Sequence, residues 1–255
     1  MFGDSYIAYI NNSWISHLRS KSQDYEIQTY GKGGSNLFYA IDQFNQAVDQ
    51  RKEKYDVVVF TSTWHQRQYS VWRYRNEQYC AFSESRKHSV YESDGRAHDP
   101  SIYNDATNAE FIETIPKFYK YMYDDRWTRF DYELEIRYIL ELPDRYPDTK
   151  FIFLPNTEHS RGIAKKHFSK GVLVDLAFET ISSSEPNAPL PPPPGEKINF
   201  GSDQRIGHLN QSNHRAVGEL MHDIISNYQE VKDKVYQVDF NKFDMIFPTK
   251  SVSET

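Results

Sequence analysis

The chain has 255 residues, of which 38% are apolar and 26% charged, and its formal net charge is −6. This length and apolar content suit one large domain with a buried core. The acidic balance argues against nucleic-acid binding, because neutralising phosphates requires clustered Lys and Arg. No run approaches the ~20 apolar residues that cross a bilayer. The single cysteine, Cys80, excludes an intrachain disulfide.

The first informative segment is the start of the chain, where residues 3–5 read Gly-Asp-Ser after a short apolar pair. This spacing puts Ser5 in a turn. No basic, apolar leader precedes it, so we expect a cytoplasmic protein, although so short an apolar start also fits a trimmed N-terminus.

A glycine-rich turn at residues 31–36 (Gly-Lys-Gly-Gly-Ser-Asn) precedes a predicted helix from Asn36 to about Arg51. Apolar residues repeat there at helical spacing, and Ser35 or Asn36 can cap the first turn. Backbone donors at a helix N-terminus attract an anion. An ordinary tight turn into the helix explains the glycines equally well.

The apolar runs 57–60, 151–154 and 172–174 are typical of strands buried on both faces of a parallel sheet. Residues 109–143 are predicted as helix, with Pro116 marking a kink or a break. A last helix follows Asn210 or Ser212 as its cap. Strands that alternate with helices indicate an α/β fold with a parallel sheet.

Residues 66–108 interrupt this alternation with aromatic and charged residues. Such an excursion after a strand lies on the ligand side of an open sheet, so we interpret it as a substrate-recognition insertion; packing against itself is the alternative. Aromatic rings stack on sugar faces. We expect one domain over residues 1–235 with this insertion and a tail over 236–255. A proline-rich connector at 189–195 leads into residues 203–208.

The order of these blocks resembles the SGNH (GDSL-type) hydrolase family over about residues 1–230. The serine is near the start, the glycine turn comes next, and Asp203 and His208 precede the final helix. The resemblance implies a flavodoxin-like, three-layer α/β/α sandwich with a central parallel sheet. It also implies that Ser5 is the nucleophile, His208 its base and Asp203 the carboxylate that orients the imidazole.

For the oxyanion hole, the resemblance implies the backbone N–H groups of Ser5 and Gly34, with Gly33 as the neighbouring candidate. Two departures from the family pattern stand out. Residues 61–66 read Thr-Ser-Thr-Trp-His-Gln, so Trp64 occupies the position of the family's asparagine. Trp64, His65 or Gln66 is then the third donor. Asp203 precedes His208 by five residues rather than three, so either a bulged loop brings it to the imidazole or a backbone carbonyl replaces it.

Three residues are candidates for substrate binding: Arg67 and Trp72 in the insertion, and His159 after the strand 151–154. A surface-loop role is the alternative for His159. His214 and His222 are expected on the polar face of the last helix. No histidine or cysteine spacing matches a metal site, so neither a metal nor an organic cofactor is expected.

These residues predict a serine esterase that cleaves an acetyl or acyl ester, on a carbohydrate, through an acyl-serine intermediate. Its partner is then a small-molecule or glycan ester, with no nucleic acid and no membrane. Two alternatives stay open. The same site can transfer the acyl group to a glycan hydroxyl, as an O-acyltransferase. A non-catalytic glycan-binding or structural protein that kept the fold accounts for the altered segment 61–66.

Overall fold

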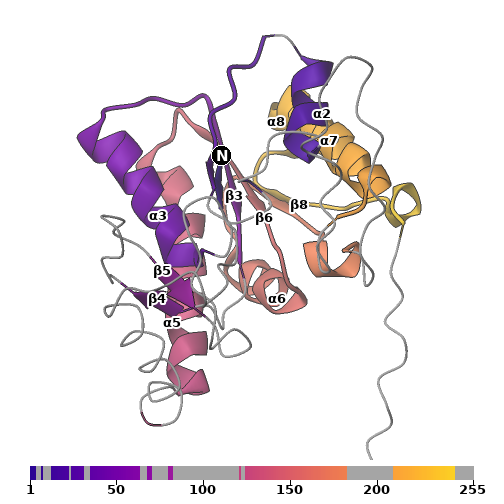
Figure 1. Ribbon diagram of the computed structural model, residues 1–255. Helices are drawn as coiled ribbons and strands as arrows, with labels where there is room; N and C mark the ends of the chain where they lie inside the picture. The colour runs from indigo at the N-terminus through magenta and orange to yellow at the C-terminus, as the bar shows by residue number, and fades with distance from the viewer. Residues whose placement is uncertain are drawn as a thin grey trace, which may run out of the picture.

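Six short strands pair in parallel to form a single sheet with the order β2-β1-β3-β6-β7-β8 (Figure 1). The computed structural model describes residues 1–3, 7, 13–22, 24–31, 35–63, 68–70, 80–82, 121, 124–182 and 209–244. The strands of the sheet are β1 (Phe2–Gly3), β2 (Tyr30–Gly31), β3 (Val57–Thr61), β6 (Lys150–Leu154), β7 (Val172–Val174) and β8 (Lys234–Tyr236).

The centre of the sheet is apolar on both faces. Strands β3 and β6 pair along their whole length, from Val57 opposite Lys150 to Thr61 opposite Leu154. Val58 belongs to the core on one face and Val59 to the core on the other. Side chains of a strand alternate between faces, so a strand covered on both sides needs a continuous apolar run. The three strands predicted from such runs are therefore confirmed.

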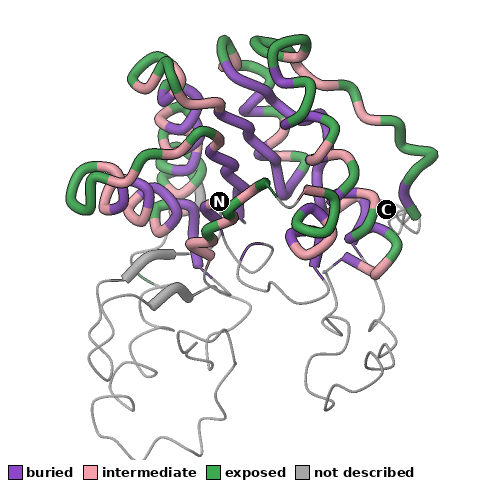
Figure 2. Tube along the Cα trace, turned by 90° about the horizontal axis from the view of Figure 1, so that it is seen from above, coloured by how far each residue is buried: buried purple, intermediate pink, exposed green. Residues whose placement is uncertain are grey.

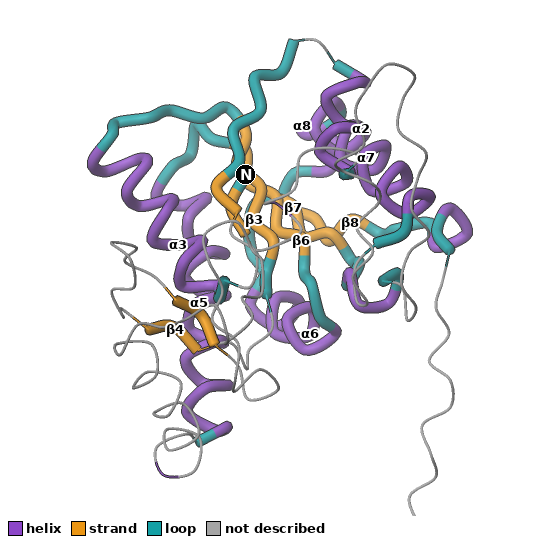
Figure 3. The backbone as a smooth tube through the Cα atoms, viewed as in Figure 1, coloured by secondary structure: helices purple, strands orange, loops and turns teal. Residues whose placement is uncertain are grey.

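Helices cover both faces of the sheet (Figures 1 and 3), and each face has its own core cluster. The central strands and the inward helix surfaces are the buried parts of the trace in Figure 2. The predicted three-layer α/β/α sandwich is thus confirmed. One face carries α3 (Leu37–Asn45), α5 (Asp125–Arg145) and α6 (Glu158–His167); the other carries α2 (Trp14–Lys21), α7 (Gln211–Ser226) and α8 (Tyr228–Val231).

Two of the predicted helix caps are confirmed. Asn36 and Asn210 cap α3 and α7 by accepting hydrogen bonds from the backbone N–H groups of Tyr39 and Asn213, at 3.1 and 2.8 Å. Helix α3 continues into a π-helical turn, Gln46–Gln50. Helix α5 begins at Asp125, capped by Asp124, whereas the prediction had started this helix at 109. Residues 109–120, and Pro116 with them, lie outside the described part.

Several elements had no sequence prediction, among them helices α2 and α8 and strands β2 and β8. Within the predicted insertion, β4 (Gln68–Ser70) and β5 (Cys80–Phe82) form a separate antiparallel pair; the rest of it is not described. Short 3-10 turns cover Phe178–Thr180 and Phe240–Lys242. None of the helices in the described ranges combines the length and apolarity needed to cross a membrane.

Candidate active site

The strand order places a topological switch between β1 and β3. From β1 the chain passes to β2 on one side, and then crosses to β3 on the other. In open α/β sheets, ligands bind in the crevice at the carboxyl ends of strands where this reversal occurs. The carboxyl ends of β1 and β3 are Gly3 and Thr61.

At the switch the two strands approach so closely that β1 must end in glycine. A Cβ atom on Gly3 would lie 2.0 Å from Thr61 Oγ1 and 2.8 Å from Ile7 Cγ1. Both distances are far inside van der Waals contact. The glycine of the Gly-Asp-Ser block is therefore a packing requirement of the sheet.

Described residues from three of the sequence blocks meet at this switch. The Ser35 hydroxyl donates to the Gly3 carbonyl at 3.4 Å, and the Thr63 hydroxyl donates to the Ser35 carbonyl at 3.0 Å. Ser35 and Thr63 are both buried. Hydrogen bonds thus link the end of β1 to Ser35, just before α3, and link Ser35 to Thr63, just after β3.

Most of the predicted site residues fall outside the part of the chain that the structure describes. Along the chain, Ser5 comes two residues after Gly3, Gly34 directly before Ser35, and Trp64 directly after Thr63. The residues outside the described ranges are Ser5, Gly33, Gly34, Trp64, His65, Gln66, Arg67, Trp72, Asp203 and His208.

His159 is described, and it lies in the first turn of α6 rather than in a surface loop. Its ring is half-buried and stacks on Tyr132 of α5, with ring centroids 6.1 Å apart and an interplanar angle of 13°. The Tyr132 hydroxyl in turn donates to the Thr63 carbonyl. His159 is therefore connected through one tyrosine to the end of β3.

Next to this contact, a serine pair joins the ends of β3 and β6. Ser62 Oγ donates to Ser160 Oγ at 2.9 Å and accepts from the Asn156 backbone N–H at 2.7 Å. Ser160 also completes a capping box with Thr157 at the start of α6. This network fixes the backbone that leaves β6.

Two polar side chains at the same edge are buried without hydrogen-bond partners. Asn156 and Thr61 are both 0% exposed. Neither the carboxamide nitrogen and oxygen of Asn156 nor the hydroxyl of Thr61 has a partner in the described structure. Sequence reasoning missed Asn156, although an asparagine two residues after a buried strand and two residues before a helix was a usable signal.

At the end of β7, charged groups tie this strand to α6. Asp175 is buried and pairs with Arg161 Nε at 2.8 Å and with Lys165 Nζ at 3.1 Å. Glu179 accepts a hydrogen bond from the Glu158 backbone N–H, while burial raises the pKa of its carboxyl. These contacts hold α6 against the segment that follows β7.

Helix α7 begins at the same edge, and its first turn is more buried than predicted. Leu209 forms an antiparallel bridge with Ser182. His214, which we expected on the polar face, is instead buried, and its Nδ1 accepts a hydrogen bond from the Trp14 backbone N–H at 3.1 Å. The imidazole satisfies a first-turn N–H of α2, which has no side-chain cap at Ser13.

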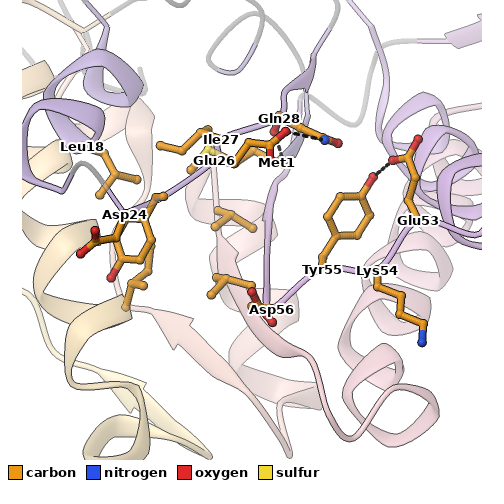
Figure 4. Close-up of a pocket in the computed structure, with 14 residues that line it drawn as sticks. Met1, Leu18, Asp24, Glu26, Ile27, Gln28, Glu53, Lys54, Tyr55 and Asp56 are labelled. Atoms are coloured by element: carbon orange, nitrogen blue, oxygen red, sulfur yellow. Dashed lines mark hydrogen bonds between the residues drawn. The ribbon is translucent and has the colours of Figure 1, made fainter.

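A cavity of about 400 Å³ lies at the amino ends of the strands, beside the starts of β1 and β3 (Figure 4). Its walls include Met1, Ile27 and Val57, and its rim carries carboxylates such as Glu53 and Asp56. Ligand sites of open α/β sheets lie at the carboxyl ends of strands, so this cavity is separate from the candidate site.

Among the described residues, no group of three or more His, Cys, Asp or Glu side chains is arranged to hold a metal ion. The polar groups of the candidate site are hydroxyls, a carboxamide and backbone amides, which suit hydrogen bonding to a neutral or oxyanionic ligand. Comparison with family models, curated proteins and solved structures finds no match to this chain.

Proposed function

We propose that this protein is a serine esterase of the SGNH type that hydrolyses an acyl ester, on a carbohydrate, through an acyl-serine intermediate. The observation that carries the proposal is the meeting of Gly3, Ser35 and Thr63 at the β1/β3 switch. Gly3 and Ser35 belong to two blocks that resemble the family, and Thr63 belongs to segment 61–66, which stands in place of the third. The parallel sheet between two layers of helices is the fold that the resemblance implies.

In this mechanism Ser5 Oγ attacks the acyl carbon while His208 accepts the hydroxyl proton. The proton then passes from His208 to the leaving alcohol, and water repeats the sequence to release the acid. Asp203 orients the imidazole and stabilises its positive charge. The N–H groups of Ser5 and Gly34 hold the oxyanion, with Trp64, His65 or Gln66 as a third donor.

The substrate class follows from the aromatic content of residues 66–108, where Arg67 and Trp72 are candidate contacts. His159 also supports it, because its ring is already held in a stack with Tyr132 close to the end of β3. Aromatic rings beside a binding site favour a carbohydrate ligand, because they stack on the faces of sugar rings.

The test is labelling by a fluorophosphonate probe together with turnover of p-nitrophenyl acetate, on wild type, Ser5→Ala and Ser20→Ala. Ser20 lies on the exposed side of α2 and serves as the matched control. We expect Ser5→Ala to lose labelling and at least about 10³-fold in kcat, because the nucleophile is removed. Ser20→Ala should match wild type.

No labelling of Ser5 and no Ser5-dependent turnover would contradict the proposal and favour a glycan-binding protein. Circular dichroism of both variants checks that they remain folded. If turnover depends on Ser5, comparing acyl release to water with transfer to added sugars separates a hydrolase from an O-acyltransferase.

A further inference from the structure

Asn156 is a buried asparagine whose carboxamide is bonded to nothing in the described structure. It is 0% exposed, and both Nδ2 and Oδ1 are without hydrogen-bond partners among the described residues. A buried, unpaired amide loses its hydration without compensation, so such groups are rare and call for an explanation. An apolar residue of the same shape would make a more stable protein.

Asn213 in α7 shows what a structural asparagine looks like in the same molecule. It is also 0% exposed, but its Nδ2 donates to the carbonyls of Ile181 and Asp244, at 2.7 and 2.9 Å. Its Oδ1 accepts from the Asp244 N–H at 2.8 Å. The two residues therefore differ in hydrogen bonding and not in burial.

The backbone of Asn156, unlike its side chain, is held on both sides. Its N–H donates to Ser62 Oγ at 2.7 Å, and its carbonyl accepts from the Glu179 N–H at 2.8 Å. The carboxamide is thus carried on a fixed support while its own hydrogen-bonding capacity is unused. Donors that are fixed before a ligand arrives are the kind that stabilise developing charge, because they need no reorganisation.

The position of Asn156 matches the candidate site. It lies two residues beyond Leu154, which pairs with Thr61 at the carboxyl end of β3. Thr61 in turn faces Gly3 across the switch. Asn156 therefore lies just beyond β6, the strand next to β3, on the side of the sheet at which β1 and β3 end.

We propose that Asn156 is a catalytic residue of the esterase, whose Nδ2–H donates a hydrogen bond to the acyl oxygen of the substrate. This role rests on the proposed function. When Ser5 Oγ bonds to the acyl carbon, the carbonyl π pair moves onto the oxygen, and Asn156 stabilises that charge without giving up a proton. As the bond to the leaving alcohol breaks, the alcohol takes its electron pair and the proton from His208.

The experiment compares Asn156→Leu with Asn213→Leu, a matched pair of buried asparagines exchanged for an apolar side chain of similar size. For each variant we measure Tm, kcat and KM for p-nitrophenyl acetate, and the rate of fluorophosphonate labelling. Asn156→Leu should keep or raise Tm, because it removes two unpaired polar atoms. Its kcat and labelling rate should fall by ~10²–10³-fold, the cost of one oxyanion donor, with little change in KM.

Asn213→Leu should show the opposite pattern. It leaves the Asp244 N–H and the carbonyls of Ile181 and Asp244 without their hydrogen-bond partner. Tm should therefore fall by roughly 5 °C. The folded fraction should keep wild-type kcat. A structural role for Asn156 would instead give both variants this same loss of Tm.

Two results would overturn the role of Asn156 alone: Ser5-dependent turnover and labelling that Asn156→Leu leaves intact, or a loss of Tm in Asn156→Leu equal to that in Asn213→Leu. A wild type without Ser5-dependent turnover or labelling would overturn the esterase and the role of Asn156 together. The Ser5→Ala measurements therefore distinguish the two failures.

Discussion

At the scale of single residues, three donors converge on the carboxylate of Glu53, near the start of β3. The Tyr30 hydroxyl donates at 2.7 Å and Arg51 Nε at 2.6 Å, and the Tyr55 hydroxyl completes the set. Hydrogen bonds from Tyr55, then Tyr30 and Arg51, lower the pKa of Glu53 to about 2. Burial, with the hydrogen bond to Glu53, raises the pKa of Tyr55. The sequence showed none of this, because the hydrogen bond from Tyr30 comes from a different strand.

This network predicts an acid-sensitive contribution to stability. The lowered pKa means that Glu53 stabilises the fold above the usual carboxyl pKa of ~4.3, and that this contribution is lost as the pH falls towards about 2. Glu53→Gln should therefore have a lower free energy of unfolding than wild type at pH 7. Near pH 2 the difference between the two unfolding free energies should become smaller. Urea unfolding at both pH values measures this.

Glu141 provides the control for this pH effect. Its pair with Arg145, at 3.4 Å, is exposed on α5, and exposed pairs contribute little. Glu141→Gln should track wild type at both pH values. A Glu53→Gln curve parallel to wild type over the whole range would contradict the network's contribution.

At the scale of elements, helices α2 and α7 pack so closely that only glycine fits between them. A Cβ atom on Gly218 would lie 2.6 Å from His17 Cβ and 2.9 Å from the Trp14 carbonyl oxygen. His214 joins the same two helices by accepting from the Trp14 N–H. The sequence predicted α7 from its apolar stripe, but it gave no sign that α2 would be the partner.

Gly218→Ala should therefore destabilise the protein although alanine favours helix. The propensity gain is ~1 kcal/mol, and forcing α2 away from α7 costs ~1–3 kcal/mol, as overpacking does elsewhere. We expect a net loss of up to about 2 kcal/mol in the free energy of unfolding, measured by urea titration.

Gly162 on α6 is the matched control, because a Cβ atom there would meet nothing within 4 Å. Gly162→Ala should raise stability by up to ~1 kcal/mol. If both glycine variants gained stability alike, the close approach of α2 and α7 would be refuted.

At the scale of the whole molecule, the sheet is completed by the last described part of the chain. Strand β8 pairs with β7, Val172 opposite Lys234 and Val174 opposite Tyr236. Further on, Phe243 is buried in the core shared by α2 and α7. Asn213 then holds the Asp244 backbone through both its N–H and its carbonyl.

Removing residues 233–255 should cost more than about 3 kcal/mol in the free energy of unfolding, since it deletes a strand, a buried phenylalanine and a hydrogen-bond clamp. It also uncovers the edge of β7, so we expect aggregation. Differential scanning calorimetry and light scattering measure the two effects. Deleting only residues 245–255 keeps every one of these contacts and is the control; equal stability of the two truncations would contradict the prediction.

Local patterns in the sequence were sufficient for the layers of this fold. Apolar runs identified β3, β6 and β7, helical spacing identified α3 and α7, and asparagine caps marked where both helices begin. These signals are local because a strand or helix buried in a sandwich must itself carry the apolar residues that the core requires. Strand β2 has only two residues, and β8 reads Lys-Val-Tyr, so neither contains the continuous apolar run that identified the three-residue strand β7.

The candidate site depended on tertiary structure to a greater degree. The sequence named the serine, histidine and glycine blocks through a resemblance, and their roles stay predictions. Only the fold revealed that Gly3 lacks room for a side chain beside Thr61, that His214 caps α2, and that Asn156 is buried without a partner. Each of these depends on which atoms from distant parts of the chain come within a few ångströms. Apolar patterning decides which face is buried, whereas hydrogen bonding and close approach are decided by the packed structure.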